Sequence, residues 1–258
     1  MDRLTEYMVM VYAGLVGACV GSFLNVCVYR WPEELSVVSP PSRCGSCGTP
    51  IKWYDNVPVL GWLLLRGKCR ACGARISIQY PLVELLTAAL WVIAAWRFGL
   101  SWQTLATALF FTILLGIALS DARTYIIPDQ FTLGGLVLGV ALSFAPGGIS
   151  PVRSLIGAAV GFGLLWLVAV VGEWAFKKPA MGGGDIKMMA MVGAFLGPVG
   201  VLLTVFLGAL FGSLIFAPIS YRTGKLVPFG IFLALGAAIT EPFGQAMIDW
   251  YVRNFLVV

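Results

Sequence analysis

Apolar stretches of about 20 residues recur along nearly the whole chain, and no other feature constrains its fold so strongly. A helix needs roughly 20 apolar residues to cross the hydrocarbon core of a bilayer. Only 11% of the 258 residues are charged, whereas a typical soluble domain has about 25%. Since so few polar side chains cannot cover a water-facing surface, the sequence predicts an all-α polytopic membrane protein.

We expect about eight transmembrane helices, of which the fourth and sixth are short for a full crossing. Prolines lie at or near most boundaries, where helices tend to stop or start. We interpret the first segment as a retained helix, because no small-residue cleavage site follows it. The predicted segments are Tyr7–Tyr29, Leu82–Phe98, Trp102–Ser120, Phe131–Ala145, Val152–Trp174, Ile186–Leu196, Val199–Ser220 and Phe229–Tyr251.

The distribution of Lys and Arg predicts the orientation. With the N-terminus outside, 13 of the 17 basic residues fall on the cytoplasmic side. These are Arg30, Arg43, Lys52, Arg66, Lys68, Arg70, Arg75, Arg123, Lys177, Lys178, Lys187, Arg222 and Lys225, against Arg3, Arg97, Arg153 and Arg253 outside. We therefore expect a multi-pass protein of the cell inner (cytoplasmic) membrane. The net charge of +5 then suits acidic lipid headgroups of the bilayer and no nucleic acid.

One polar, turn-rich insert interrupts the apolar pattern between the first and second predicted helices. It is too long for a simple connection and too short for a large core of its own. The sequence therefore predicts three parts: a first transmembrane helix at 1–29, a cytoplasmic cysteine subdomain at 30–81, and a transmembrane catalytic bundle at 82–258.

The insert carries two CxxC pairs, Cys44 with Cys47 and Cys69 with Cys72, separated by 21 residues. A glycine follows each pair, which suits a tight turn that points two thiolates at one ion. Four thiolates at this spacing are typical of a structural zinc ribbon. Disulfides are the alternative, but the charge distribution places the insert in the reducing cytoplasm, where they rarely persist. We expect a structural Zn²⁺ whose binding stabilises this small subdomain.

The other two cysteines, Cys19 and Cys27, lie inside the first apolar helix. Free cysteine is among the most buried residue types and behaves as a small hydrophobe. We therefore predict that both are buried packing residues, with a ligand or redox role as the alternative.

Two aspartates stand at the cytoplasmic ends of predicted helices. Asp121 follows the apolar stretch of the third segment, and Asp185 comes directly after three glycines and opens the sixth. Either acid alone is unremarkable near the interface, and Asp185 also suits a helix N-cap. However, both fall on the same face, so they can meet. The glycines also let the backbone approach a neighbour or an extended substrate closely.

The residue types narrow the chemistry that such a pair performs. The chain has no histidine, which excludes Ser-His and Cys-His hydrolytic machinery. Two carboxyl groups that share one proton need no histidine, because one activates a water and the other hydrogen-bonds to the scissile carbonyl. A peptidase dyad of Asp121 and Asp185 is one hypothesis. The alternatives are a proton-coupled carrier, which would place its acids near the midplane and show paired repeats, and an assembly scaffold organised by the cysteines.

Several motifs follow one another in a specific order along most of the chain. They are Gly21-Ser-Phe-Leu-Asn-Val-Cys-Val-Tyr-Arg30, the two cysteine pairs around Trp53-Tyr-Asp-Asn-Val-Pro58, Tyr80-Pro-Leu-Val-Glu-Leu-Leu86, Asp121 with Ile127-Pro-Asp129, and Gly182-Gly-Gly-Asp185-Ile-Lys187. In this order they resemble the type IV prepilin leader peptidases, a family of GxGD aspartic proteases.

The resemblance implies an intramembrane aspartic endopeptidase with Asp121 and Asp185 as its catalytic residues. Its substrates would be type IV prepilins or type II secretion pseudopilins, cut at the cytoplasmic face. Many members of the family also methylate the new N-terminal amine with S-adenosylmethionine, so a bifunctional enzyme is expected. No glycine-rich fingerprint for this donor is visible in the sequence, and its binding residues stay unassigned. Asp129 is either a helix-start cap or a partner for a lysine of the leader.

Overall fold

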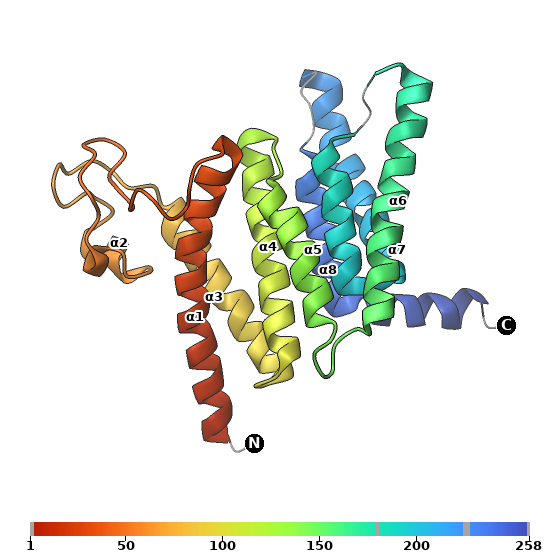
Figure 1. Cartoon of the computed structure of the whole chain (residues 1–258), viewed down its shortest axis with the longest axis horizontal. Helices are drawn as coiled ribbons and strands as arrows, with labels where there is room; N and C mark the ends of the chain where they lie inside the picture. The colour runs from red at the N-terminus through yellow and green to blue at the C-terminus, as the bar shows by residue number, and fades with distance from the viewer. Residues whose placement is uncertain (1–2, 179–180, 224–227, 257–258) are drawn as a thin grey trace. The chain divides into compact units, whose positions relative to one another are not determined.

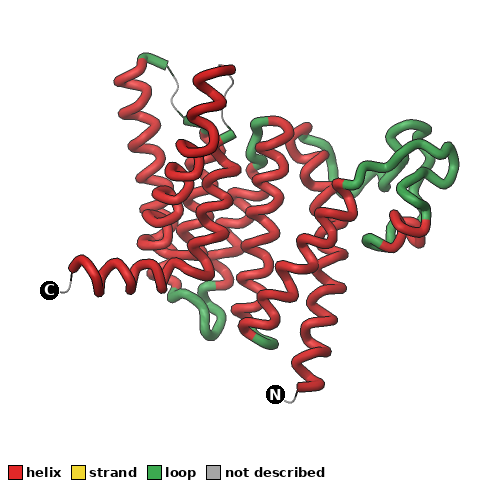
Figure 2. Tube along the Cα trace, turned by 180° about the vertical axis from the view of Figure 1, so that it is seen from behind, coloured by secondary structure: helices red, strands yellow, loops and turns green. Residues whose placement is uncertain are grey.

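The computed structural model describes residues 3–178, 181–223 and 228–256, and the side chains of these residues apart from 216–223 and 256. These ranges contain helices, turns and loops and no strand (Figure 2). The helices are α1 (Arg3–Arg30), α2 (Leu60–Leu64), α3 (Gln79–Phe98), α4 (Trp102–Thr124), α5 (Asp129–Leu142), α6 (Pro151–Phe176), α7 (Gly183–Thr223) and α8 (Phe229–Tyr251) (Figure 1). The chain divides into two compact units, Met1–Thr112 and Ile113–Val258.

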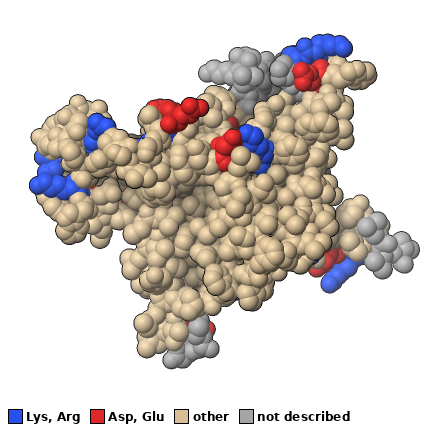
Figure 3. All heavy atoms as spheres, viewed as in Figure 1, with Lys and Arg blue, Asp and Glu red and all other residues tan. Residues whose placement is uncertain are grey.

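The predicted fold class, an all-α multi-pass membrane protein, is confirmed. Within the described ranges, six helices are long and apolar enough to cross a membrane, and α5, with 14 residues, is shorter. The eight predicted segments coincide with helices, the sixth and seventh both lying in α7, but the fourth ends three residues early, at Leu142 instead of Ala145. On the face seen in Figure 3, charged side chains gather at helix ends and on the loop between α1 and α3, while the helix middles carry none.

In the first unit, α1 packs closely against α3 because small residues line the contact. A Cβ atom added to Gly17 would lie 2.8 Å from Cβ of Trp91, and one added to Gly21 would lie 2.8 Å from Cα of Glu84. Such small residues are the usual means of close helix packing in membranes. The Trp91 indole N–H also donates to the Thr112 hydroxyl at 3.0 Å, which ties α3 to α4 within this unit.

One prediction about α1 is wrong. Cys27 is buried, as expected, but Cys19 is exposed. The two residues lie eight positions apart, which places them about 80° apart around the helix. Only the face that carries Gly17, Gly21 and Leu24 is turned inward, so the apolar character of the helix did not imply burial on every side.

In the second unit, α7 consists of two helices joined at Gly197. This glycine has φ 74° and ψ 179°, values outside the helical region, and the chain reverses there. The first part of α7 runs parallel to α5, and the second runs antiparallel to α8, which starts at the end where α7 starts (Figure 1). The neighbouring pairs are Gly135 with Met191, Gly139 with Phe195, Gly208 with Leu233, and Gly236 with Thr204. The predicted division between the sixth and seventh segments coincides with this reversal.

The first part of α7 also packs against α6 with almost no side chain between the two backbones. A Cβ atom on Gly157 would overlap the carbonyl oxygen of Gly193, and one on Gly161 would overlap that of Met189. The buried hydroxyl of Ser154 donates to the carbonyl oxygen of Ala194 at 2.8 Å. These contacts hold the first part of α7 tightly against α6.

We expect Gly161→Val to destabilise the second unit by about 1–3 kcal/mol or more, because the new side chain must displace backbone atoms. Gly163→Val is the matched control on the same helix, since no atom lies within 4 Å of a Cβ at Gly163. Thermal unfolding in detergent measures both variants. Equal melting temperatures for the two would contradict the close packing of α6 on α7.

Candidate active site and metal site

The first candidate site lies at one end of the second unit, where α4 ends and α7 and α8 begin. Asp121 stands three residues before the end of α4 and is only 5% exposed. Its Oδ2 accepts a hydrogen bond from the backbone N–H of Ile231 at 3.1 Å. This N–H belongs to the first turn of α8, where helix donors lack partners within the helix and favour a negative charge.

Asp185 lies in the first turn of α7, and the structure brings it close to Asp121. The two carboxyl groups are near enough to interact electrostatically. Oδ1 of Asp185 is buried and has no hydrogen-bond partner among the described residues. A buried carboxyl oxygen without a partner is costly, so this atom is suited to receive a donor from a ligand, a water or its own proton.

Glycines allow the three segments to converge. A Cβ on Gly184 would lie 2.9 Å from Cβ of Ile127, and a Cβ on Gly230 would lie 2.8 Å from Oδ2 of Asp121. Side chains at these two positions would therefore push the segments apart. Gly183, in contrast, has nothing within 4 Å, so not all three glycines before Asp185 are required by close packing among the described residues.

Asp129, the third acid near this end, forms an ion pair with Lys187. Nζ of Lys187 lies 2.7 Å and 2.8 Å from the two carboxylate oxygens. The pair joins the start of α5 to the start of α7, two residues beyond Asp185. The Asp129 side chain is 53% exposed and that of Lys187 is 39% exposed. The pair therefore contributes little to stability, and its main effect is to hold the start of α7 beside the start of α5.

We expect Lys187→Asp to lower kcat/KM for peptide cleavage by up to about 10²-fold through displacement of Asp185. Stability should change by less than about 1 kcal/mol, because the pair is exposed. The exchanged pair Asp129→Lys with Lys187→Asp should restore most of the activity. If the exchanged pair stays as impaired as the single variant, Asp129 acts on the substrate instead, for example on a leader lysine.

The second candidate site gathers the four cysteines of the loop between α1 and α3. The Sγ atoms of Cys44, Cys47, Cys69 and Cys72 all lie within 4.8 Å of one another. Those of Cys44 and Cys72 are 3.8 Å apart, the separation of roughly 3.8 Å that two ligands of a tetrahedral ion acquire at a metal–sulfur distance of about 2.3 Å. The cluster can therefore bind a metal ion.

Both cysteine pairs adopt the same tight turn. Gly48 donates to the carbonyl oxygen of Cys44 and Gly73 to that of Cys69, each at 2.9 Å. Both glycines have φ 72°, the left-handed region that glycine enters without strain. The predicted turn at each glycine is thus confirmed.

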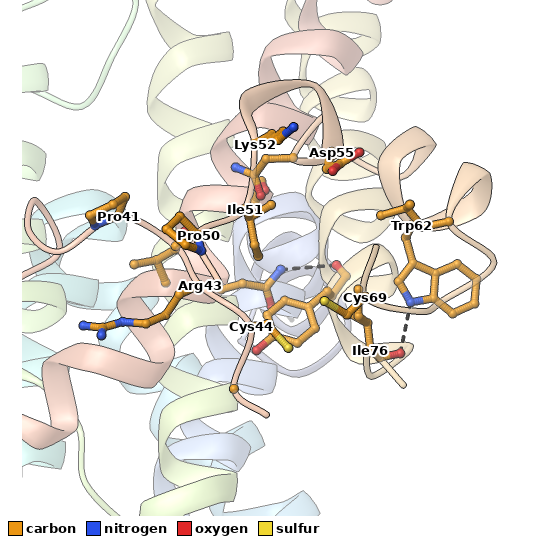
Figure 4. Close-up of a pocket in the computed structure, with 18 of the residues that line it drawn as sticks. Pro41, Arg43, Cys44, Pro50, Ile51, Lys52, Asp55, Trp62, Cys69 and Ile76 are labelled. Carbon is orange, nitrogen blue, oxygen red and sulfur yellow. Dashed lines mark hydrogen bonds between the residues drawn. The ribbon is translucent and has the colours of Figure 1, made fainter. Parts of the chain in front are cut away.

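The surroundings favour the ligating form of the thiol in the first CxxC pair. Hydrogen bonding with the side chain and backbone of Thr49 lowers the pKa of Cys47 to about 6. Backbone hydrogen bonds from Cys47 and Ser46 lower the pKa of Cys44 (Figure 4). The thiolate is the form that binds metals, so these contacts prepare the first pair for a cation. Cys72 differs: a backbone hydrogen bond from Ala74 lowers its pKa, but hydrogen bonds with the neighbouring cysteines outweigh this contact and raise the pKa to about 11.

Two residues that contact Asp121 are not indicated by the sequence: Gly230 and Ile231. Pro228 indicates a helix start, but no pattern indicates that this start meets the end of α4, 110 positions earlier. The sequence thus points to the aspartates but not to the backbone donor that holds one of them.

The fold and these sites define a multi-pass helical membrane protein with an aspartate pair at the ends of its helices. Residues 15–98 match the family described as "Bacterial Peptidase A24 N-terminal domain", and residues 108–217 match the "Type IV leader peptidase family". The chain belongs to the type IV leader peptidase family, and the resemblance seen in the sequence motifs is confirmed.

Similar proteins from several bacteria bear the name "Prepilin leader peptidase/N-methyltransferase". The protein of Aeromonas hydrophila is 36% identical over 94% of this chain and 93% of its own length. That of Neisseria gonorrhoeae is 36% identical over 94% of each. That of Myxococcus xanthus is 41% identical over 88% of this chain but only 64% of its own length. No solved structure matches the chain.

Proposed function

We propose that this chain is an intramembrane aspartic endopeptidase that removes the leader from type IV prepilins and related pseudopilins and then methylates the new N-terminal amine. Membership of the type IV leader peptidase family and the names of the full-length relatives support both activities. The observation that carries the peptidase is the convergence of Asp121 and Asp185 at one end of the bundle.

Asp121 and Asp185 would share one proton, because two carboxylates this close cannot both ionise easily. Asp121 already accepts a backbone N–H, whereas Oδ1 of Asp185 has no described partner. The proton therefore fits best on Asp185, where it hydrogen-bonds to the scissile carbonyl. Asp121 takes a proton from the attacking water, whose oxygen bonds to the carbonyl carbon. Asp121 then passes this proton to the leaving nitrogen as the C–N bond breaks.

The aspartates at helix ends fit this role better than that of a carrier. A carrier would place its acids near the middle of the bilayer, whereas Asp121 is three residues from the end of α4 and Asp185 two residues from the start of α7. A position at the helix ends suits a substrate whose apolar helix lies in the membrane and whose leader lies outside it.

We place this end of the bundle on the cytoplasmic side of the inner membrane. Among the described residues of the second unit, Arg123, Lys177, Lys178, Lys187 and Arg222 lie at the aspartate end, and Arg153 and Arg253 lie at the other end. An excess of Lys and Arg is typical of cytoplasmic loops. Lys225, which the sequence analysis assigned to the same side, lies outside the described residues.

We further propose that the four cysteines hold a structural Zn²⁺. Four sulfur ligands complete a tetrahedral site and leave no open position for a catalytic water. The ion would therefore act as a scaffold for the cytoplasmic cysteine subdomain, residues 30–81, between the first transmembrane helix (1–29) and the catalytic bundle (82–258).

The purified protein, incubated with a prepilin and S-adenosylmethionine in liposomes, tests the proposed function. We expect mass spectrometry to find the mature pilin without its leader and heavier by one methyl group. Intact prepilin after prolonged incubation, with the enzyme folded, would contradict the peptidase. A cleaved but unmethylated product would contradict only the second activity.

A further inference from the structure

The C-terminal end of the described chain leaves the helix bundle of the second unit and runs crosswise to it. α8 contains Pro242, and a proline inside a helix removes a backbone hydrogen bond and bends the helix. The end of α8 and the π-helical turn Val252–Leu256 then extend sideways from α6, toward the label C in Figures 1 and 2. We call residues 243–256 the C-terminal arm. Because it runs crosswise to helices that span the membrane, it lies along the plane of the bilayer.

The arm belongs to the end of the bundle that lies opposite to the aspartates. α8 begins beside Asp121, whose Oδ2 accepts a hydrogen bond from the N–H of Ile231 at 3.1 Å. The helix then runs through the unit, so its last residues lie near the start of α6, where Arg153 is located. The arm therefore lies where α8 reaches the far boundary of the membrane.

The arm has one apolar face and one polar face. Gln245 and Asp249 are four positions apart and share a face, where Nε2 of Gln245 donates to Oδ1 of Asp249 at 2.9 Å. Trp250 lies about 140° around the helix from Gln245. Large apolar side chains recur beside Trp250 at spacings of three and four residues, which places them on one face. The residues of this apolar face are Phe243, Met247, Trp250 and Tyr251.

Three aromatic rings of the arm form an exposed cluster. The ring of Phe255 stacks on that of Tyr251 with centroids 5.3 Å apart and meets the Trp250 ring edge-on at 5.6 Å. Each of the three residues is more than half exposed, Trp250 at 61%. A contiguous exposed apolar patch marks a site that binds a protein or a membrane. Trp and Tyr are enriched at membrane–water interfaces, because their rings are apolar at one end and polar at the other.

The charges of the arm favour lipid over protein as its partner. Asp249 and Arg253 are the two charged residues in it, and the charged atoms seen on it in Figure 3 lie on the side that faces away from the bundle. An interfacial helix has this arrangement, with its apolar face toward the acyl chains and its charges toward the headgroups and water. A second copy of the chain would cover the aromatic cluster, but it would not require the charges to face away from the membrane helices.

We propose that the C-terminal arm is a lipid-binding surface in the leaflet opposite to the aspartate end. The rings of Trp250, Tyr251 and Phe255 lie at the boundary between acyl chains and headgroups, and Arg253 binds a headgroup phosphate. The arm thereby anchors the end of α8 that lies farthest from Asp121. Neither leader cleavage nor methylation uses this surface, so the inference does not depend on the proposed function.

Photo-crosslinking in liposomes of phosphatidylethanolamine and phosphatidylglycerol, with this chain as the only protein, identifies what covers the arm. The variant Trp250→p-benzoylphenylalanine places a photoreactive ring in the aromatic cluster, and mass spectrometry then distinguishes a lipid adduct from a second copy of the chain. Gln245→p-benzoylphenylalanine, at an exposed position on the polar face, is the matched control. We expect about fivefold or more lipid adduct from position 250 than from position 245, because only the apolar face enters the acyl boundary.

A milder variant, Trp250→Phe, measures the depth of the arm and covers the case that the photoreactive variant misfolds. The chain has nine tryptophans, so the fluorescence of the unaltered protein minus that of Trp250→Phe reports Trp250 alone. Lipid spin labels near the headgroup should quench this fluorescence about twofold more than labels at the ends of the acyl chains, since interfacial Trp lies at the headgroup level.

Crosslinks from position 250 that mainly join two copies of the chain overturn the inference, because the arm is then a contact between copies. Equal lipid adducts from positions 250 and 245 overturn it as well, since lipid then surrounds the arm on both faces. The absence of any adduct places the arm in water and has the same consequence. Stronger quenching by the deep labels than by the shallow ones places Trp250 inside the bilayer core and contradicts an interfacial position.

Discussion

Replacing Asp121 or Asp185 by Asn is expected to lower kcat for leader cleavage by about 10³-fold or more. Each carboxyl group would move a proton in the transition state, and a positioned acid or base contributes about 10²–10⁴-fold. Asn has nearly the same shape as Asp, so the close contacts of Asp121 with Gly230 and the first turn of α8 persist. The measurement is single-turnover cleavage of a prepilin in detergent, with melting temperature and prepilin binding recorded for each variant.

The control is Asp249→Asn, a conservative change near the end of α8 in the same unit, where Asp249 accepts a hydrogen bond from Gln245 at 2.9 Å. It should cleave at the rate of the unaltered enzyme. The double variant of Asp121 and Asp185 should be little slower than either single variant, because residues that act as a unit are strongly non-additive. Near-normal cleavage by either single variant would remove that aspartate from the mechanism and direct attention to Asp129.

The fold was predictable from the sequence because the bilayer imposes a simple rule. A segment that crosses it must be apolar and about 20 residues long, and backbone groups must bond within the segment. The rule holds for α1, α3, α4, α6 and α8 within a few residues. It does not predict the geometry at Gly197, since a glycine followed by Pro198 permits a kink as readily as the complete reversal observed.

The cysteine site was predictable for a similar reason. Both halves of the site are short local motifs, and each CxxC with its following glycine determines its own turn. Only the contact between the two turns joins residues that are far apart in the sequence. The spacing of the pairs suggests it, and the distances among the four Sγ atoms confirm that the thiols converge.

The surroundings of the aspartates were not predictable in the same way. Asp121 meets Ile231, 110 positions away, and Lys187 meets Asp129, 58 positions away. These contacts depend on which helix ends are neighbours in the fold, and a single sequence does not show which helices are neighbours.

If the four cysteines hold the proposed Zn²⁺, the cysteine loop is expected to lose its ordered structure when the metal is removed. The segment between α1 and α3 has no strand and only the five-residue helix α2 and two short 3₁₀ helices among its described residues, and it buries little apolar surface. Metal binding by four thiolates contributes on the order of 10 kcal/mol or more to the folding of such domains. No other interaction in the loop approaches that value, since its ion pair of Asp55 with Arg70 is largely exposed on the Arg70 side.

Cys47→Ser tests this dependence, and Cys19→Ser is the matched control because Cys19 is exposed and stands outside the cluster. Elemental analysis should find about one zinc per chain in the unaltered protein and the control and little in Cys47→Ser. Hydrogen exchange across residues 43–75 should rise to near the unprotected rate in the variant, while the membrane helices stay protected. Zinc loss with unchanged exchange would mean that the loop folds without metal. Contacts such as the hydrogen bond from the Val59 backbone N–H to Oε2 of Glu84, at 2.7 Å, would then hold the loop.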